Sequence, residues 1–273
     1  MKKVILIGNP VSQSLSPALH NHWLAELGIE GFFEARKTEA KEIKSLISDL
    51  RGGRLAGINV TIPHKETAFS LLDEFSEAAG KIGAANTLYI TQGKLARKNT
   101  DPEGFMENLK FSAPDWDPSG TALVLGTGAA AKAVIYALQK AGQKNIFICG
   151  RNLEKAKGLE KTFSEIKITC LKWQAWEQAG NEASLLINTT PLGLPGFGPV
   201  NFDLTVLKEN ALVYDLVYGR EKTDFLKTAQ ARGLKTVDGL GMLVFQAIPA
   251  FETWFGKRPV MEENLLNILR NKR

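Results

Sequence analysis

Short apolar runs rich in β-branched residues alternate along the chain with amphipathic segments of helical periodicity. In the first hundred residues the runs predict strands at 4–7, 32–35, 55–60, 87–91 and 94–98, and the dipeptide Gln92-Gly93 joins the last two as a hairpin. Helices are expected from Ser16, which precedes a first-turn proline, to about Gly28, and over 40–51. This alternation is typical of a mostly parallel sheet covered by helices.

A polar stretch with two prolines, residues 108–120, predicts a surface crossing between this series and a second one. After it, strands are expected at 121–125, 145–149, 166–170, 185–188 and 212–216, and helices at 129–141 and 153–163. Two further apolar helices, 239–254 and 261–270, can complete the second unit or return to the first. The pattern therefore predicts two α/β domains.

Composition and charge narrow the class of protein. The 273 residues suffice for about two domains, and a 44% hydrophobic fraction indicates a folded chain. Lys and Arg outnumber Asp and Glu by 34 to 29, an excess that favours an anionic small molecule over nucleic acid. No apolar run approaches the roughly 20 residues that span a bilayer, so we expect no membrane partner. Cys149 and Cys170 lack a CxxC spacing, which fits the reducing cytoplasm.

A glycine-rich turn opens the second series. The strand 121–125 leads into Gly126, Thr127 and Gly128, and then into an alanine-rich helix start at Ala129 and Ala130. Glycines here let the backbone approach a pyrophosphate, which the N–H groups of the helix start can bind. Alanine replaces the third glycine of the usual fingerprint, so a plain strand-to-helix turn is the alternative.

The residues after the next strand indicate which dinucleotide is expected. An NAD site would place Asp or Glu near the adenosine ribose, whereas this chain has Gly150, Arg151 and Asn152. A guanidinium can bind a 2′-phosphate through two hydrogen bonds, and a carboxylate would repel it. We therefore expect NADP(H); a solvated loop cation is the alternative for Arg151.

Polar side chains also follow the strands of the first series. Ser14 and Ser16 lie between the first strand and its helix, where a helix start favours a carboxylate; the alternative is that they only cap the helix and form the turn. Lys65 follows the third strand, where partial burial would let a lysine exchange a proton near neutrality, and Asp101 can pair with it. Asn86 is expected as a neutral partner for a polyol. The three histidines lack zinc-site spacing, so we expect no metal.

In their order, these motifs resemble those of the shikimate dehydrogenase family over nearly the whole chain. The motifs are Gly8-Asn-Pro-Val-Ser-Gln-Ser-Leu-Ser-Pro17 with His20-Asn21, Asn59-Val-Thr-Ile-Pro-His-Lys65, Gly83-Ala-Ala-Asn-Thr87, Asn99-Thr-Asp101, Asn188-Thr-Thr-Pro-Leu-Gly193, Asp215-Leu-Val-Tyr218 and Gly239-Leu-Gly-Met-Leu243 with Gln246-Ala247.

The resemblance implies NADPH-dependent, reversible reduction of 3-dehydroshikimate to shikimate in aromatic amino acid biosynthesis, by a monomer or homodimer. It implies that Ser14 and Ser16 bind the substrate carboxylate and that Lys65 and Asp101 are the catalytic pair at the C3 oxygen. The further substrate residues that it implies are Thr61, Asn86, Tyr218 and Gln246, and it adds Thr189 and Gly239 to the cofactor set of Gly126, Thr127, Gly128, Ala129, Ala130, Arg151 and Asn152.

The resemblance further implies a substrate domain of residues 1–101 completed by 238–273, a Rossmann-type NADP-binding domain of 102–237, and an active-site cleft between them. Four positions depart from the family pattern: Ala129 replaces a glycine of the phosphate loop, Gly150 and Asn152 replace the asparagine and threonine that flank the arginine, and Pro102 replaces a glycine. The loss of hydrogen bonds on the two sides of Arg151 predicts a reduced selectivity for NADP.

Two alternative functions stay open. A quinate/shikimate dehydrogenase would accept the extra C1 hydroxyl of quinate and also NAD, and Arg151 with the Ser14 and Ser16 pair disfavours it. A non-catalytic NADP(H)-binding regulatory module would have no use for a proton donor, so the presence of both Lys65 and Asp101 disfavours it.

Overall fold

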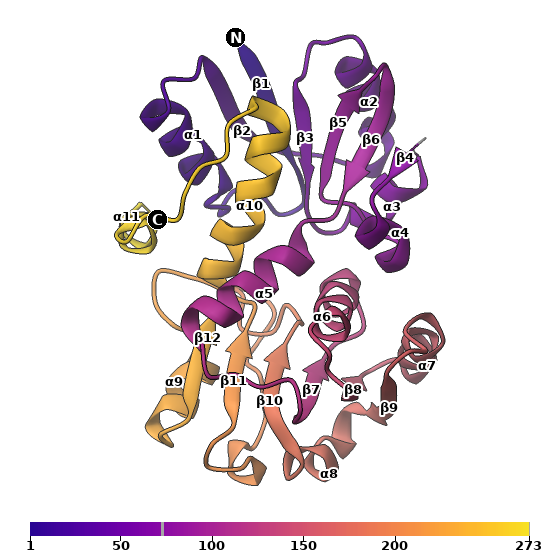
Figure 1. Cartoon of the computed structure of the whole chain (residues 1–273), viewed down its shortest axis with the longest axis vertical. Helices are drawn as coiled ribbons and strands as arrows, with labels where there is room; N and C mark the ends of the chain where they lie inside the picture. The colour runs from indigo at the N-terminus through magenta and orange to yellow at the C-terminus, as the bar shows by residue number, and fades with distance from the viewer. Residues whose placement is uncertain (72–73, 273) are drawn as a thin grey trace. The chain divides into compact units, whose positions relative to one another are not determined.

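The computed structural model describes residues 1–71 and 74–272, which form two compact units, each built on a six-stranded sheet (Figure 1). Unit 1 comprises Met1–Gly104 and the residues from Leu243 onward, and unit 2 comprises Phe105–Met242. Both divisions fall inside helices, α5 (Asp101–Ser112) and α10 (Gly239–Phe255), whereas the sequence suggested 101/102 and 237/238. A continuous helix carries no change of composition that would mark such a division.

The expected surface crossing over 108–120 is wrong in its first part. Residues 108–112 end helix α5, and Asn108 is buried, with its amide N–H donating to the Tyr214 hydroxyl at 2.6 Å and to the Asp238 carbonyl at 2.9 Å. The sequence suggested an exposed loop because an asparagine in a polar, proline-bearing stretch has the composition of one.

The sheet of unit 1 has the strand order β2-β1-β3-β5-β6-β4. β1 pairs in parallel with β2 and β3, and β4 with β6, whereas β5 is antiparallel to β3 and β6. The strands are β1 (Lys2–Gly8), β2 (Gly31–Lys37), β3 (Gly57–Val60), β4 (Glu74–Phe75), β5 (Thr87–Thr91) and β6 (Lys94–Lys98). The helices are α1 (Ser16–Glu26), η1 (Ala40–Glu42), α2 (Ile43–Arg51), α3 (Lys65–Ser70), α4 (Glu77–Ile82) and α11 (Leu265–Asn271).

Apolar side chains cover both faces of this sheet, which explains its nearly continuous apolar central strands. Ile5 and Ile7 share a core cluster with residues of α2. A second cluster of unit 1 consists of aromatic rings, among them His20, Phe33 and Trp254. The rings of His20 and Phe33 are stacked, with their centroids 4.1 Å apart. Burial lowers the pKa of His20 to about 3, so this histidine is a neutral core residue.

The sheet of unit 2 is entirely parallel, in the order β12-β11-β10-β7-β8-β9. Successive strands are added on one side of β7 up to β9 and on its other side from β10 onward. The boundary between β7 and β10 is therefore the switch point where doubly wound folds bind ligands. The strands are β7 (Thr121–Leu125), β8 (Asn145–Gly150), β9 (Lys167–Lys172), β10 (Ala183–Asn188), β11 (Leu212–Asp215) and β12 (Lys235–Asp238). The helices are α6 (Ala129–Lys140), α7 (Leu153–Thr162), η2 (Trp173–Ala175), α8 (Glu177–Gly180), η3 (Leu204–Val206) and α9 (Asp224–Ala231).

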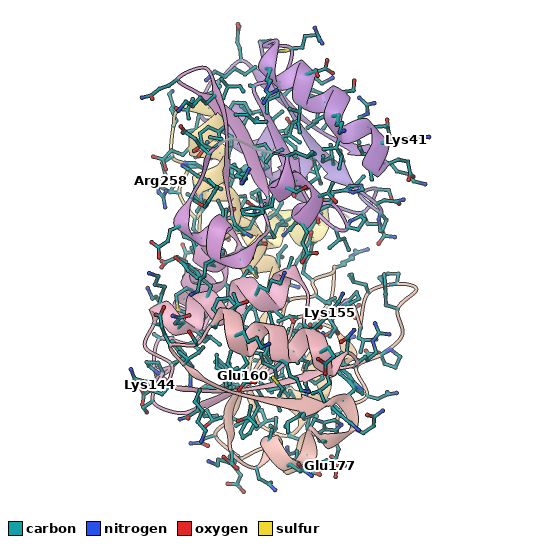
Figure 2. All side chains as sticks on the ribbon, turned by 90° about the vertical axis from the view of Figure 1, so that its right-hand side faces the viewer. Lys41, Lys144, Lys155, Glu160, Glu177 and Arg258 are labelled. Atoms are coloured by element: carbon teal, nitrogen blue, oxygen red, sulfur yellow. The ribbon has the colours of Figure 1, made fainter. Side chains whose placement is uncertain are left out.

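Strand β7 shows how both faces of this second sheet are used. Ala122 and Val124 contribute to the core cluster that also holds residues of α6 and α7, whereas Leu123 and Leu125 pack in the cluster that holds residues of α9. The charged side chains that Figure 2 labels all lie at the surface. The two α/β domains predicted from the alternation are therefore confirmed.

Among residues 1–71 and 74–272, no helix combines the length and the apolar character that a membrane-spanning segment requires.

Candidate functional site

Three polar motifs of unit 1 meet at one edge of its sheet. Because β5 runs antiparallel to its neighbours, the start of β5 lies beside the ends of β3 and β6: Thr87 is in register with Asn59 and with Lys98. The segments 59–65, 83–87 and 99–101 therefore come together, although they are far apart in the sequence.

Lys65 and Asp101 form an ion pair at this edge. Lys65 begins α3, Asp101 begins α5, and the Lys65 Nζ lies 2.5 Å from Asp101 Oδ2. The two side chains are only 17% and 7% exposed, so water screens their attraction less than that of a surface pair. The pairing expected from the sequence is present; its catalytic role stays a prediction.

Asn86 holds the second oxygen of the same carboxylate. Its Nδ2 donates to Asp101 Oδ1 and to Thr100 Oγ1, each at 2.9 Å, and its Oδ1 accepts from the Thr100 backbone N–H at 3.1 Å. Asn99 Oδ1 accepts from the Asp101 N–H at 3.0 Å, and Gln246 Oε1 lies 3.3 Å from Asn86 Nδ2. Sequence reasoning did not select Asn99 or Thr100, although the Asn-Thr-Asp motif contained both.

Ser14 and Ser16 lie in the segment between β1 and α1. Their hydroxyls are 3.2 Å apart, and Ser16 makes no capping bond with its side chain because it is itself the first residue of α1. The alternative that Ser16 only caps the helix is therefore wrong. Ser14 does accept the Ser16 backbone N–H at 3.2 Å, as a turn residue would.

The turn after β3 packs closely on the end of β1. Thr61 N–H donates to the Ile7 carbonyl and Asn9 N–H to the Ile62 carbonyl, both at 2.9 Å. A side chain at Gly8 would collide with Thr61 and with the Ile62 carbonyl, so this approach requires glycine. The serine segment and the turn that leads to Lys65 thus leave the sheet next to each other.

His64, which precedes Lys65 in the same motif, is another side chain that can transfer protons. Its side chain is buried, and its Nε2 lies 2.7 Å from the Thr38 carbonyl oxygen, to which it must donate. This bond ties the ring to the residue that follows β2, so His64 is a weaker candidate than Lys65.

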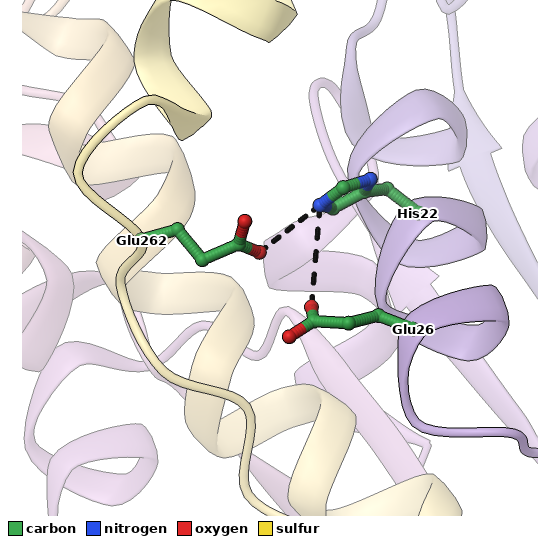
Figure 3. Close-up of side chains that lie close together, drawn as sticks. All are labelled: His22, Glu26 and Glu262. Atoms are coloured by element: carbon green, nitrogen blue, oxygen red, sulfur yellow. Dashed lines mark hydrogen bonds and ion pairs between the residues drawn. The ribbon is translucent and has the colours of Figure 1, made fainter.

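A group of three potential metal ligands lies elsewhere in unit 1 (Figure 3). His22 Nε2 is 3.0 Å from Glu262 Oε1 and 4.0 Å from Glu26 Oε2, and Glu262 raises the pKa of Glu26 through a hydrogen bond. These interactions join α1 to the segment before α11. Because imidazole and carboxylate are metal-ligand types, the expected absence of a metal stays a prediction.

The glycine-rich turn of unit 2 fits a pyrophosphate. Gly126 has a φ of +116°, and a Cβ there would lie 2.6 Å from Thr189 Oγ1. Thr189 donates its hydroxyl to the Leu125 carbonyl at 2.6 Å, which joins the ends of β7 and β10 at the switch point. Within the described part of the chain no side chain caps α6, whose N-cap is Gly128, so its start presents backbone and not side-chain donors.

Arg151 is exposed after β8, as a 2′-phosphate ligand would be. Asn152 is the N-cap of α7, and its Oδ1 accepts the Lys155 N–H at 2.9 Å. Lys155, which Figure 2 labels, is a second exposed cation in the first turn of α7 that sequence reasoning did not select. Its position four residues after Arg151 was the available signal.

Tyr218 and Gly239, the remaining predicted residues of unit 2, lie outside the glycine-rich turn and the segment after β8. Tyr218 is half-buried after β11, and the other predicted substrate residues belong to unit 1. Gly239 begins α10, where a side chain would collide with the Leu216 carbonyl. Close packing therefore explains this glycine without a ligand.

The chain matches three family models. They are described as "Shikimate dehydrogenase substrate binding domain" for residues 6–88, "Shikimate / quinate 5-dehydrogenase" for 115–240 and "Shikimate 5'-dehydrogenase C-terminal domain" for 239–260. A curated relative from Brucella abortus (strain S19), named shikimate dehydrogenase (NADP(+)), is 42% identical over 267 residues, which are 97% of this chain and 92% of that protein.

Solved structures have the same fold. The shikimate 5-dehydrogenase of Thermus thermophilus, in complex with NADP(H) and shikimate, has a TM-score of 0.87 and 35% identity and covers 100% of this chain and 99% of its own. The quinate dehydrogenase of Corynebacterium glutamicum, in complex with NAD, has a TM-score of 0.85 and 27% identity over 99% of this chain and 97% of its own. Since the family models match most of the sequence and the relatives resemble it over nearly their full length, this chain belongs to the shikimate dehydrogenase family.

Proposed function

We propose that this protein is an NADP-dependent shikimate dehydrogenase that interconverts 3-dehydroshikimate and shikimate in aromatic amino acid biosynthesis. The largely buried Lys65–Asp101 ion pair at the sheet edge of unit 1 carries the proposal, since a lysine ammonium can serve as the proton donor in the reduction of a carbonyl. The family match and the name of the Brucella relative support the reaction and the cofactor.

Bound NADPH supplies a hydride for the C3 carbonyl carbon. Negative charge then builds on the C3 oxygen, and the Lys65 ammonium stabilises this charge more strongly in the transition state than in the ground state. Lys65 donates its proton to that oxygen, which completes the alcohol, and it regains a proton from solvent. Asp101, held by Asn86 on its other oxygen, accepts a hydrogen bond from the ammonium and holds it in place.

The remaining substrate contacts are assigned by chemistry and position. Ser14 and Ser16 bind the carboxylate at the start of α1, where a helix end favours an anion. Thr61, Asn86 and Gln246 bind ring hydroxyls or lie near them, and Tyr218 lines the substrate site.

The cofactor is assigned to unit 2. Gly126, Thr127, Gly128, Ala129 and Ala130 form the pyrophosphate turn, with Thr189 beside it. Arg151 binds the 2′-phosphate and Asn152 supports it by capping α7; Gly239 completes the predicted set. We also assign the protein to the cytoplasm, because Cys149 and Cys170 are both free.

The test is an absorbance assay of the full chain with shikimate or quinate, each with NADP or NAD. The proposal expects the fastest turnover with shikimate and NADP. Faster turnover with quinate and NAD would instead support a quinate dehydrogenase, and binding of NADP without turnover of either substrate would support a regulatory module.

A further inference from the structure

Asp215 is a buried carboxylate that no step of the proposed reaction uses. It ends β11 with no exposed surface, and it accepts three hydrogen bonds. Oδ1 accepts from Asn188 Nδ2 at 2.8 Å and from the Val217 backbone N–H at 3.1 Å, and Oδ2 accepts from the Thr223 hydroxyl at 2.7 Å. The donors come from the end of β10, the segment after β11 and the N-cap of α9. One side chain therefore joins three segments at the carboxyl edge of the sheet.

Asn188 extends this network into the loop after β10. Its Oδ1 accepts from the Thr190 N–H at 3.0 Å and from the Thr190 hydroxyl at 2.6 Å, and its Nδ2 also lies 3.1 Å from the Leu192 carbonyl. Thr189, between these contacts, packs against Gly126 of the pyrophosphate turn. The position of the loop 189–193 at this turn thus depends on the orientation of Asn188, which Asp215 holds.

The burial of a carboxylate here is costly for the fold. Desolvation raises the pKa of Asp215 to about 6, although the three hydrogen bonds act in the opposite direction and lower it. Asp238 lies in register with it on β12 and adds like charge, whereas the hydrogen-bond donors to Asp215 are all neutral groups. A residue that served packing alone could be an apolar side chain of similar size, so a buried polar side chain here indicates a demand for loop geometry.

We propose that Asp215 is the positioning residue of the cofactor-binding unit: it presets the loops 189–193 and 216–223 so that Thr189 and Tyr218 are in place before NADP(H) binds. This inference rests on the proposed function. Preset loops lose less conformational freedom on binding, which increases affinity without a contact between Asp215 and the ligand.

Three variants test the inference: Asp215→Leu, Asp215→Asn and the control Asp203→Leu. Asp203 is an exposed aspartate of unit 2 that accepts the Thr205 N–H at 2.9 Å. Calorimetric titration gives the Kd for NADP without substrate, and amide hydrogen exchange of the cofactor-free protein reports on the loops. Asp215→Leu should raise the Kd by about tenfold or more and speed exchange in both loops, because each lost hydrogen bond contributes about a factor of ten.

The conservative variant separates positioning from general stability. Asp215→Asn keeps an oxygen for Asn188 and Val217 and should restore the Kd to within about threefold of wild type. Asp203→Leu should leave the Kd and the exchange of both loops unchanged.

Several outcomes would overturn the inference. A folded Asp215→Leu protein with a lower Tm and a wild-type Kd for NADP would make Asp215 a purely structural residue. If Asp215→Leu does not fold, Thr223→Val tests the inference in its place. Loss of the hydroxyl that donates to Asp215 Oδ2 should speed amide hydrogen exchange in 216–223 and not in 189–193. Unchanged amide exchange in 216–223 would overturn the inference. Wild type that binds NADP without oxidising shikimate contradicts the proposed reaction alone, and wild type that binds no NADP overturns both.

Discussion

The two sheets end in polar edges that handle buried charge in opposite ways. In unit 1 the carboxylate of Asp101 has a cation partner, Lys65, 2.5 Å away. In unit 2 the carboxylate of Asp215 accepts, among the described residues, only from an amide, a backbone N–H and a hydroxyl. A paired charge can stabilise charge that develops in a reaction, whereas a carboxylate among neutral donors fixes the geometry of loops. Substitutions in unit 1 should therefore act on substrate turnover and binding, and those in unit 2 on cofactor binding and pH-dependent stability.

The largest effect is expected from Lys65→Ala. Loss of the proton donor should lower kcat by about 10² to 10⁴, with little change in the KM for shikimate, because the ammonium acts mainly in the transition state. Asp101→Asn should lower kcat as well. Steady-state kinetics check both variants, with the exposed Lys41→Ala as the matched control that keeps wild-type kcat. A near-normal kcat for Lys65→Ala would refute the assignment of Lys65 as proton donor and make His64 the next candidate.

The next effect is on stability and concerns Asp215. Its pKa in the fold, about 6, lies above the ordinary value of 3.8, so the folded state retains a proton that the unfolded chain releases. The contribution of this group to the free energy of unfolding is therefore full below about pH 4 and decreases as the pH rises to 6, by up to about 3 kcal/mol. Asp215→Asn should remove this decrease in denaturant unfolding measured across that range.

Asp203→Asn is the control for the direction in which stability changes with pH. Hydrogen bonds from the Thr205 hydroxyl and N–H lower the pKa of Asp203, so its contribution is present at neutral pH and is lost as the pH falls. The two variants should change the pH profile in opposite directions. If Asp215→Asn and wild type showed the same pH dependence of the free energy of unfolding, burial would not raise the pKa of Asp215.

Arg151→Ala sharpens the cofactor side of the comparison. Loss of a charge-assisted hydrogen bond to the 2′-phosphate should weaken NADP(H) by about 1 to 3 kcal/mol and scarcely alter NAD. Titration with both cofactors measures this, and Lys144→Ala, another exposed cation of unit 2, should change neither affinity. Equal losses for NADP and NAD would assign Arg151 a structural role instead.

The smallest effects are expected at Ser14 and Ser16. Replacement of either serine by alanine should raise the KM for shikimate by about tenfold, the cost of one hydrogen bond to a charged group. The Kd for NADP should not change, since the serines lie in unit 1. Two single variants that both keep the wild-type KM would leave only a local role in the turn.

Helix α5 shows where prediction from the pattern failed. Its first turn contains Pro102, which a helix start tolerates, and Gly104, which disfavours a helix. The apolar residues that follow, Phe105 and Leu109, are buried in the core. Gly104 is needed because a side chain there would collide with the backbone and Cβ of Gln246 on α10. Only the neighbour from the other end of the chain makes this glycine favourable inside a helix.

The site shows the same division. Sequence reasoning selected Lys65, Asp101 and Asn86 because each lies near the end of a strand in a recognisable motif. It assigned Asn86 to substrate alone, whereas the structure shows that Asn86 also holds Asp101. It placed Asp215 in a family motif but gave it no role, because the role depends on hydrogen-bond donors that are distant in the sequence.

The sequence by itself determined the alternation of strands and helices, the glycine turn and the polar strand ends, because these depend on residues adjacent in the chain. The sequence also predicted the antiparallel hairpin of β5 and β6, which is confirmed. Tertiary structure alone decided that β5 pairs antiparallel with β3, which brings Thr87 into register with Asn59, and that Asp215 holds Asn188, Val217 and Thr223. The physical reason is that the strength of an ion pair or a buried hydrogen bond depends on distance and burial. Sheet register and packing fix both quantities between residues that are far apart in the chain.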